Sequence, residues 1–150
     1  MKMSPCVLLV DDDQAVREAL RNVLQQTGYE VVLAPDGQEG ADLLKARCFD
    51  LLLLDLELPG LSGWEVLDLS REHYPSMPVV ILTGFLGQCV PGSLEGTDAR
   101  LEKPPDVIPL LETIAELLAE SPASRLQRRS RRQTETRGFQ PQKPVDHGIP

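Results

Sequence analysis

The sequence is poor in the residues that mark several common classes of protein. Its 150 residues include three cysteines and two histidines. No Cys-x-x-Cys pair is present, which argues against a disulfide framework or a structural zinc site. The apolar runs are too short to span a bilayer, and the N-terminal segment lacks the apolar stretch of a signal peptide. These absences predict a reduced, cytoplasmic protein that does not associate with membranes.

The charged residues are distributed unevenly along the chain. Residues 1–120 hold 8 basic and 21 acidic residues, a net charge of −13, whereas residues 121–150 hold 7 and 2, a net charge of +5. An acidic body argues against nucleic-acid binding by residues 1–120. The basic segment contains a cluster that could contact nucleic acid or an acidic partner weakly. Its arginines are Arg125, Arg128, Arg129, Arg131 and Arg132.

Short apolar runs alternate with amphipathic segments through most of the chain. Uninterrupted runs of this kind predict strands that are buried on both faces of a parallel sheet. The predicted strands are residues 6–10, 30–34, 51–55, 78–83 and 99–103. The segments between and after them predict helices, closed at Gly28 and opened by a capping box at Ser62 and Glu65. This order predicts an α/β fold, a (βα)5 doubly wound parallel five-stranded sheet of the flavodoxin-like type.

Polar residues stand at the carboxyl ends of four of the predicted strands. Asp11 and Asp12 follow the first, Asp55 ends the leucine-rich third, Thr83 ends the fourth, and Lys103 ends the fifth. Because the carboxyl ends of parallel strands share one edge of the sheet, these side chains should meet in one site. Several close carboxylates repel one another unless a cation joins them, and oxygen ligands with open positions suit Mg²⁺. A carboxylate beside Mg²⁺, an ammonium group and a hydroxyl together favour phosphoryl transfer onto an aspartate.

Residues 5–119 resemble a receiver domain of the chemotaxis-regulator type, as found in two-component response regulators. The motifs that carry the resemblance are Val10-Asp11-Asp12, Asp55-Leu56-Glu57-Leu58-Pro59-Gly60 with Gly63, Leu82-Thr83-Gly84 and Lys103-Pro104. The resemblance implies a signalling protein in a phosphorelay, which catalyses only its own phosphorylation and dephosphorylation. It implies a histidine kinase or histidine phosphotransfer protein as phosphoryl donor, an output partner that the sequence does not name, and possible homodimerisation.

The resemblance also implies a role for each site residue. Asp55 would accept the phosphoryl group. Asp12, Asp55 and the backbone carbonyl of Glu57 would hold Mg²⁺, with Asp11 acting mainly through bound water. Thr83 and Lys103 would contact the phosphoryl oxygens, and a cis peptide bond would precede Pro104. An aspartate-nucleophile phosphatase is the alternative, with Glu57 as its second acid, and turnover of small phosphate esters would discriminate.

Two features depart from the family pattern. Receivers usually carry an aromatic residue three positions before the lysine, and Arg100 stands there. An always-charged guanidinium is not expected to bury itself as that ring does. Residues 85–96 hold glycines and a proline that oppose a helix, so we expect a short or distorted fourth helix. We therefore predict signalling through the order of residues 84–99 rather than through an aromatic switch.

The composition changes after residue 120. Residues 1–120 are predicted to form the receiver domain. Residues 121–150 are rich in Pro, Arg and Gln with little apolar content, and such segments cannot bury enough surface to offset the entropy of ordering. We therefore expect residues 121–150 to form a disordered tail. The absence of a recognisable output domain favours a stand-alone receiver over one excised from a larger regulator.

Overall fold

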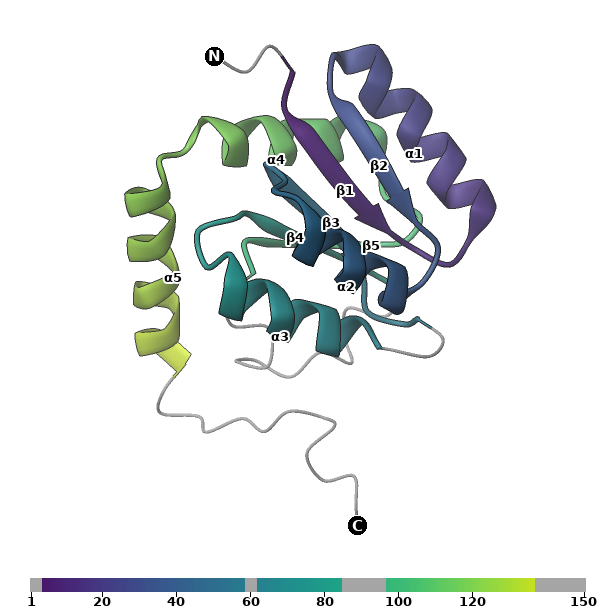
Figure 1. Cartoon of the computed structure of the whole chain (residues 1–150). Helices are drawn as coiled ribbons and strands as arrows, with labels where there is room; N and C mark the ends of the chain where they lie inside the picture. The colour runs from purple at the N-terminus through teal and green to yellow at the C-terminus, as the bar shows by residue number, and fades with distance from the viewer. Residues whose placement is uncertain (1–3, 59–61, 85–96, 137–150) are drawn as a thin grey trace.

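A computed structural model of the chain describes residues 4–58, 62–84 and 97–136. Five parallel strands form one sheet in the order β2-β1-β3-β4-β5 (Figure 1). The strands are β1 (Cys6–Val10), β2 (Glu30–Ala34), β3 (Leu51–Asp55), β4 (Val79–Thr83) and β5 (Ala99–Glu102). The helices of the described residues are α1 (Gln14–Thr27), α2 (Gly37–Ala46), α3 (Gly63–His73), α4 (Val107–Ala119) and α5 (Pro122–Thr136). The predicted flavodoxin-like sheet is confirmed.

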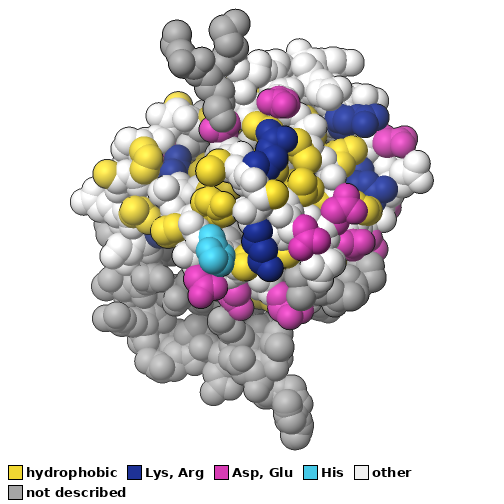
Figure 2. Space-filling view, viewed as in Figure 1, with side chains coloured by type: hydrophobic (Ala, Val, Ile, Leu, Met, Phe, Trp, Pro, Cys, Tyr) yellow, Lys and Arg dark blue, Asp and Glu magenta, His cyan; other side chains and the backbone are white. Residues whose placement is uncertain are grey.

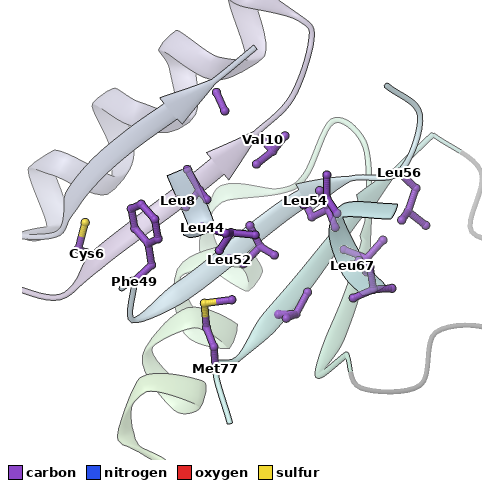
Figure 3. Packing of buried hydrophobic residues seen from close by; sticks show 14 residues of the cluster. Cys6, Leu8, Val10, Leu44, Phe49, Leu52, Leu54, Leu56, Leu67 and Met77 are labelled. Atoms are coloured by element: carbon purple, nitrogen blue, oxygen red, sulfur yellow. The ribbon is translucent and has the colours of Figure 1, made fainter. Parts of the chain in front are cut away.

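The central strands are buried because apolar side chains leave both faces of the sheet. Every residue of β1, β3 and β4 is buried. Side chains on one face pack against α2 and α3 in a cluster that includes Leu8, Leu52 and Leu54 (Figure 3). The other face packs against α1 and α4, with Leu24 and Leu110 among the buried residues. Continuous apolar runs therefore give a sheet sandwiched between two helical layers.

Local sequence signals set the helix ends. Gly28 follows α1 with φ of 108°, a left-handed conformation that favours glycine. Ser62 and Glu65 form both bonds of the predicted capping box at α3. Asp13 is the N-cap of α1, and its carboxylate accepts bonds from the amides of Ala15 and Val16.

The predicted distorted helix at 85–96 lies outside the described residues, as do Pro59 and Gly60 of the receiver motif. Figure 2 shows the face that α2 and α3 cover, where acidic, basic and hydrophobic side chains are interspersed. Among the described residues, no helix is both long enough and apolar enough to cross a bilayer.

The C-terminal segment differs from the prediction. Residues 122–136, expected to be disordered, form α5. Helix α4 ends at Ala119, and a second helix begins at Pro122. Arg125 and Arg129 are buried. The Arg125 guanidinium bonds to the Leu117 carbonyl oxygen, and the Arg129 guanidinium bonds to the Asp98 carboxylate. Composition is a poor guide here because the arginines have fixed partners; residues 137–150 lie outside the described residues.

Candidate functional site

The ends of the strands bring three aspartates together. Asp55 is the last residue of β3 and is 1% exposed, and Asp11 follows β1 and is fully buried. Asp12 is exposed. Carboxylate oxygens of these three residues lie within 4.8 Å of one another. Because β1 and β3 are adjacent and parallel, their carboxyl ends deliver these side chains to one point, as predicted.

Lys103 supplies a positive charge to this cluster. It follows β5, and its Nζ lies 3.1 Å from Asp55 Oδ2 and 3.0 Å from Asp11 Oδ2. The amide of Lys103 donates to the carbonyl of Thr83 over 2.8 Å, so the ends of β4 and β5 are joined. The peptide bond between Lys103 and Pro104 is cis, as the resemblance implies.

The backbone around Asp55 holds its carboxylate in place. The amide of Glu57 donates to Asp55 Oδ1 over 2.9 Å, leaving Oδ2 for Lys103. Gly63, at the start of α3, lies directly against this turn. A Cβ added to Gly63 would sit 2.4 Å from the Asp55 carbonyl oxygen and 2.5 Å from the Leu56 Cα. Glycine is therefore required here by close approach of two backbones.

Asp11 is anchored through both its backbone and its side chain. Its Oδ1 accepts a bond from the amide of Asp13 over 2.9 Å. Its amide donates to the carbonyl of Ala34, which ties the end of β1 to β2. Its own carbonyl accepts from the guanidinium of Arg17 over 2.8 Å. Nothing in the sequence singled out Arg17, because its partner is a backbone atom rather than a charged side chain.

Burial and neighbouring charges act against each other in this cluster. Burial raises the pKa of the Asp55 carboxyl above its usual value, although the Glu57 amide and Lys103 act in the opposite direction. For Lys103, burial alone would lower the pKa. Hydrogen bonding to Asp11 and Asp55 outweighs burial, so the pKa of Lys103 is raised and its ammonium form is favoured.

The donor set suits a small, hard cation. All three aspartate side chains offer oxygen atoms, and one member of the cluster, Asp12, is exposed, which leaves a side open to water. Mg²⁺ prefers oxygen ligands, keeps several waters and is shared with phosphate oxygens. One ammonium group also leaves two negative charges of the three aspartates unbalanced. The residues present therefore fit Mg²⁺.

Two further predicted residues border the cluster. Thr83 ends β4, next to β3 in the sheet, and is 4% exposed. Glu57 lies two residues after Asp55, and a Cβ added to Gly84 would lie 3.5 Å from Glu57 Oε1, which places this carboxylate beside the end of β4. Arg100 is exposed on β5, in agreement with the expectation that its guanidinium stays in water.

Comparison with known proteins agrees with this geometry. Residues 7–115 match the family model described as the response regulator receiver domain. The chain is 40% identical over 118 residues to the response regulator MprA of Mycobacterium tuberculosis strain H37Rv, covering 77% of this chain and 51% of that protein. It is 35% identical over 115 residues to the response regulator protein FleR of Pseudomonas aeruginosa, covering 75% and 24%. The chain thus spans about half or less of the length of these relatives.

Solved structures share the fold. A CheY-like receiver domain protein from Methanospirillum hungatei has a TM-score of 0.71 and 32% identity, covering 77% of this chain and 94% of that one. The response regulator TrrA from Thermotoga maritima, solved in complex with Mg²⁺-BeF, has a TM-score of 0.71 and 31% identity, covering 75% and 98%. The matched family model covers more than half of the chain. The chain belongs to the response regulator receiver domain family of two-component signalling.

Proposed function

We propose that Asp55 accepts a phosphoryl group from a phosphohistidine in a Mg²⁺-dependent reaction. The donor would be a histidine kinase or a histidine phosphotransfer protein, since response regulators receive phosphate from histidine kinases. The observation that carries the proposal is the buried carboxylate of Asp55 at the strand end, in contact with Lys103 and within 4.8 Å of two other carboxylates. The relative solved with Mg²⁺-BeF supports magnesium as the cofactor.

In the proposed reaction, a carboxylate oxygen of Asp55 attacks the phosphorus atom of the donor. A phosphorus–oxygen bond forms, the phosphorus–nitrogen bond breaks, and the imidazole leaves with the bonding electron pair and takes up a proton. The Glu57 amide holds Oδ1, so Oδ2, which faces Lys103, is the attacking oxygen. Little covalent chemistry is required of the protein beyond positioning and charge neutralisation.

The surrounding residues would neutralise and orient the transferred group. The Lys103 ammonium would move from the Asp55 carboxylate to a phosphoryl oxygen, and the Thr83 hydroxyl would donate to another. Asp12, Asp55 and the Glu57 carbonyl would hold Mg²⁺, with Asp11 acting through water. The bound cation would offset the negative charge of the phosphoryl oxygens. Self-catalysed hydrolysis of the aspartyl phosphate would reset the domain.

The signal would leave the domain through phosphorylation-dependent binding of an output partner, with homodimerisation as one possible form. Arg125, Arg128 and Arg129 bond within the protein, so a nucleic-acid surface at residues 125–132 would lack three of its five arginines.

A cytoplasmic location is part of the proposal. Cys48 is an exposed free thiol, which suits a reducing compartment.

Incubation with acetyl phosphate tests this function directly. Intact mass would be measured for the wild type and for Asp55→Asn, each with and without Mg²⁺. We expect one added phosphoryl group that requires both Mg²⁺ and Asp55. Equal labelling of Asp55→Asn, or labelling of the wild type that is indifferent to Mg²⁺, would refute the proposal.

A further inference from the structure

Helix α5 docks at the amino-terminal ends of β4 and β5, whereas the candidate site lies at the carboxyl ends of the strands. Figure 1 shows α5 on the side away from the strand arrowheads. Its contacts agree, because they reach residues that precede β4 and β5 rather than residues that follow them. Among residues 122–130 the buried side chains are Arg125 and Arg129, while Leu126 is 43% exposed. Over residues 122–130, α5 is therefore held by arginines and not by an apolar face.

Arg125 and Arg129 both donate to backbone carbonyls of the segments that pack against α5. Arg125 donates to the carbonyl of Ser76 and to the carbonyls of Leu117 and Glu120 at the end of α4. Arg129 donates to the carbonyls of Pro75 over 2.6 Å and Met77 over 3.0 Å. Buried carbonyls require partners, and a cation is favourable at a helix C-terminus.

Asp98 is the carboxylate on which α5 is fastened. Its side chain is fully buried. Arg129 binds it in a bidentate fork, with Nε 3.0 Å from Oδ1 and Nη2 2.5 Å from Oδ2. Arg128 reaches the same carboxylate over 2.7 Å and also bonds to Glu120. Burial would raise the pKa of Asp98, but Arg129, the Val79 amide and Arg128 outweigh it and lower the pKa.

The same carboxylate sets the start of β5. Asp98 Oδ2 accepts a bond from the amide of Val79 over 2.8 Å, and the amide of Asp98 donates to the carbonyl of Val79 over 2.8 Å. At the other end of the strand, the amide of Lys103 donates to Thr83. The edge strand β5 is four residues long, and about 16 Å separates Asp98 from Lys103 at the usual rise of a strand.

We propose that α5 is an ionic clasp on Asp98 that holds β5 against β4 and thereby positions Lys103 at the carboxylate cluster. If the arginines are removed, a buried carboxylate keeps too few partners, so Asp98 must move toward water and release the Val79 amide. A short edge strand freed at one end cannot keep its register, and Lys103 loses its position. The receiver unit then extends to α5 instead of ending at residue 120.

The clasp and the candidate site are coupled in both directions. The second half of the proposal rests on the proposed function, because it concerns the placing of Lys103 for a phosphoryl group. By thermodynamic linkage, a variant that loosens the clasp weakens phosphoryl-group binding, and phosphoryl-group binding tightens the clasp by the same factor. A purely structural role for α5 would lower stability without changing affinity in the folded protein.

The test uses the full chain with beryllium fluoride and Mg²⁺ as the phosphoryl mimic. Affinity would be measured by calorimetry at a temperature where thermal unfolding shows each variant to be folded. Amide exchange of residues 122–130 would be measured with and without the mimic. The variants are Arg129→Gln, Arg129→Lys, which keeps the charge but not the fork, and Arg128→Gln at the more exposed partner. Arg21→Gln on α1 is the control for loss of one positive charge.

We expect Arg129→Gln to speed exchange in α5 and to weaken mimic binding about fivefold or more, the low end of coupling between protein sites. Arg129→Lys and Arg128→Gln should fall between it and the wild type, and Arg21→Gln should match the wild type. In the wild type, the mimic should slow α5 exchange. If Arg129→Gln frees α5 and the affinity for the mimic stays unchanged, the clasp proposal is overturned while the proposed function stands.

Two other results would also decide. Fast exchange of α5 in the wild type would show that no clasp exists. Failure of the wild type to bind the mimic while α5 is protected would overturn the proposed function, and the coupling with it. If Arg129→Gln does not fold, Arg128→Gln carries the comparison, because Arg128 is 34% exposed and removing it leaves the Arg129 fork in place.

Discussion

Gly63→Ala is expected to damage the candidate site and the fold together. The added Cβ would lie 2.4 Å from the Asp55 carbonyl oxygen, whereas ordinary contact begins at 3.4 Å, so the two backbones must separate by 1.0 Å. Neither obstructing group is a flexible side chain. Overpacking of this kind costs about 1–3 kcal/mol. A shift of about 1 Å at a reacting group can slow a reaction about 100-fold.

The assay for Gly63→Ala pairs urea unfolding with the rate of labelling by acetyl phosphate. Gly28→Ala is the matched control, because Gly28 has φ of 108° and nothing within 4 Å of an added Cβ. It should lose stability through backbone strain, by about 1–2 kcal/mol, with its labelling rate intact. If Gly63→Ala is labelled no more slowly than Gly28→Ala, the close approach does not position Asp55 and the reasoning fails.

Three further predictions concern charge and hydrogen bonding. Lys103→Met removes the cation that competes for the carboxylates, so Mg²⁺ should bind at least about tenfold more tightly by calorimetry, since one charge at contact is worth about 4 kcal/mol near a surface; an unchanged affinity would contradict this. Thr83→Val should slow labelling by acetyl phosphate while leaving Mg²⁺ affinity near the wild-type value, and a matched loss of both would count against a role for the hydroxyl at the phosphoryl group. The folded-state pKa of Asp98 is lowered, so its contribution to stability is present above the unfolded value of about 3.9 and is lost as pH falls through the lower folded pKa. The stability difference between wild type and Asp98→Asn in urea should therefore shrink below about pH 4, and a difference that does not vary with pH would show that Asp98 is not ionised in the fold.

The strand-end residues could be predicted from the sequence because each follows its own buried run. Uninterrupted apolar residues before Asp11, Asp55 and Thr83 indicate a parallel sheet, and a parallel sheet has one carboxyl edge. Local signals such as the capping box at Ser62 could also be predicted from the sequence. The close approach of Gly63 to Asp55 could not be predicted, because it depends on where α3 begins relative to β3 in space.

Helix α5 shows where composition fails as a guide. Arg125 and Arg129 are four residues apart and so share a helix face, but an arginine face usually indicates a helix surrounded by solvent. Their partners are the carboxylate of Asp98 and carbonyls that include those of Ser76 and Met77, from segments far away in the sequence. Such partners have no local pattern. The predicted end of the domain at residue 120 rested on missing apolar content, which this helix does not use.

Locating the phosphoryl group tests most directly whether Asp55 is the phosphoryl acceptor. After labelling with acetyl phosphate and Mg²⁺, borohydride reduction converts an aspartyl phosphate into homoserine, and peptide mass spectrometry locates the reduced residue. We expect homoserine at position 55 alone, dependent on Mg²⁺. Reduction at Asp11, Asp12 or Glu57 instead, with Asp55 intact, would contradict the assignment of Asp55 as the phosphoryl acceptor.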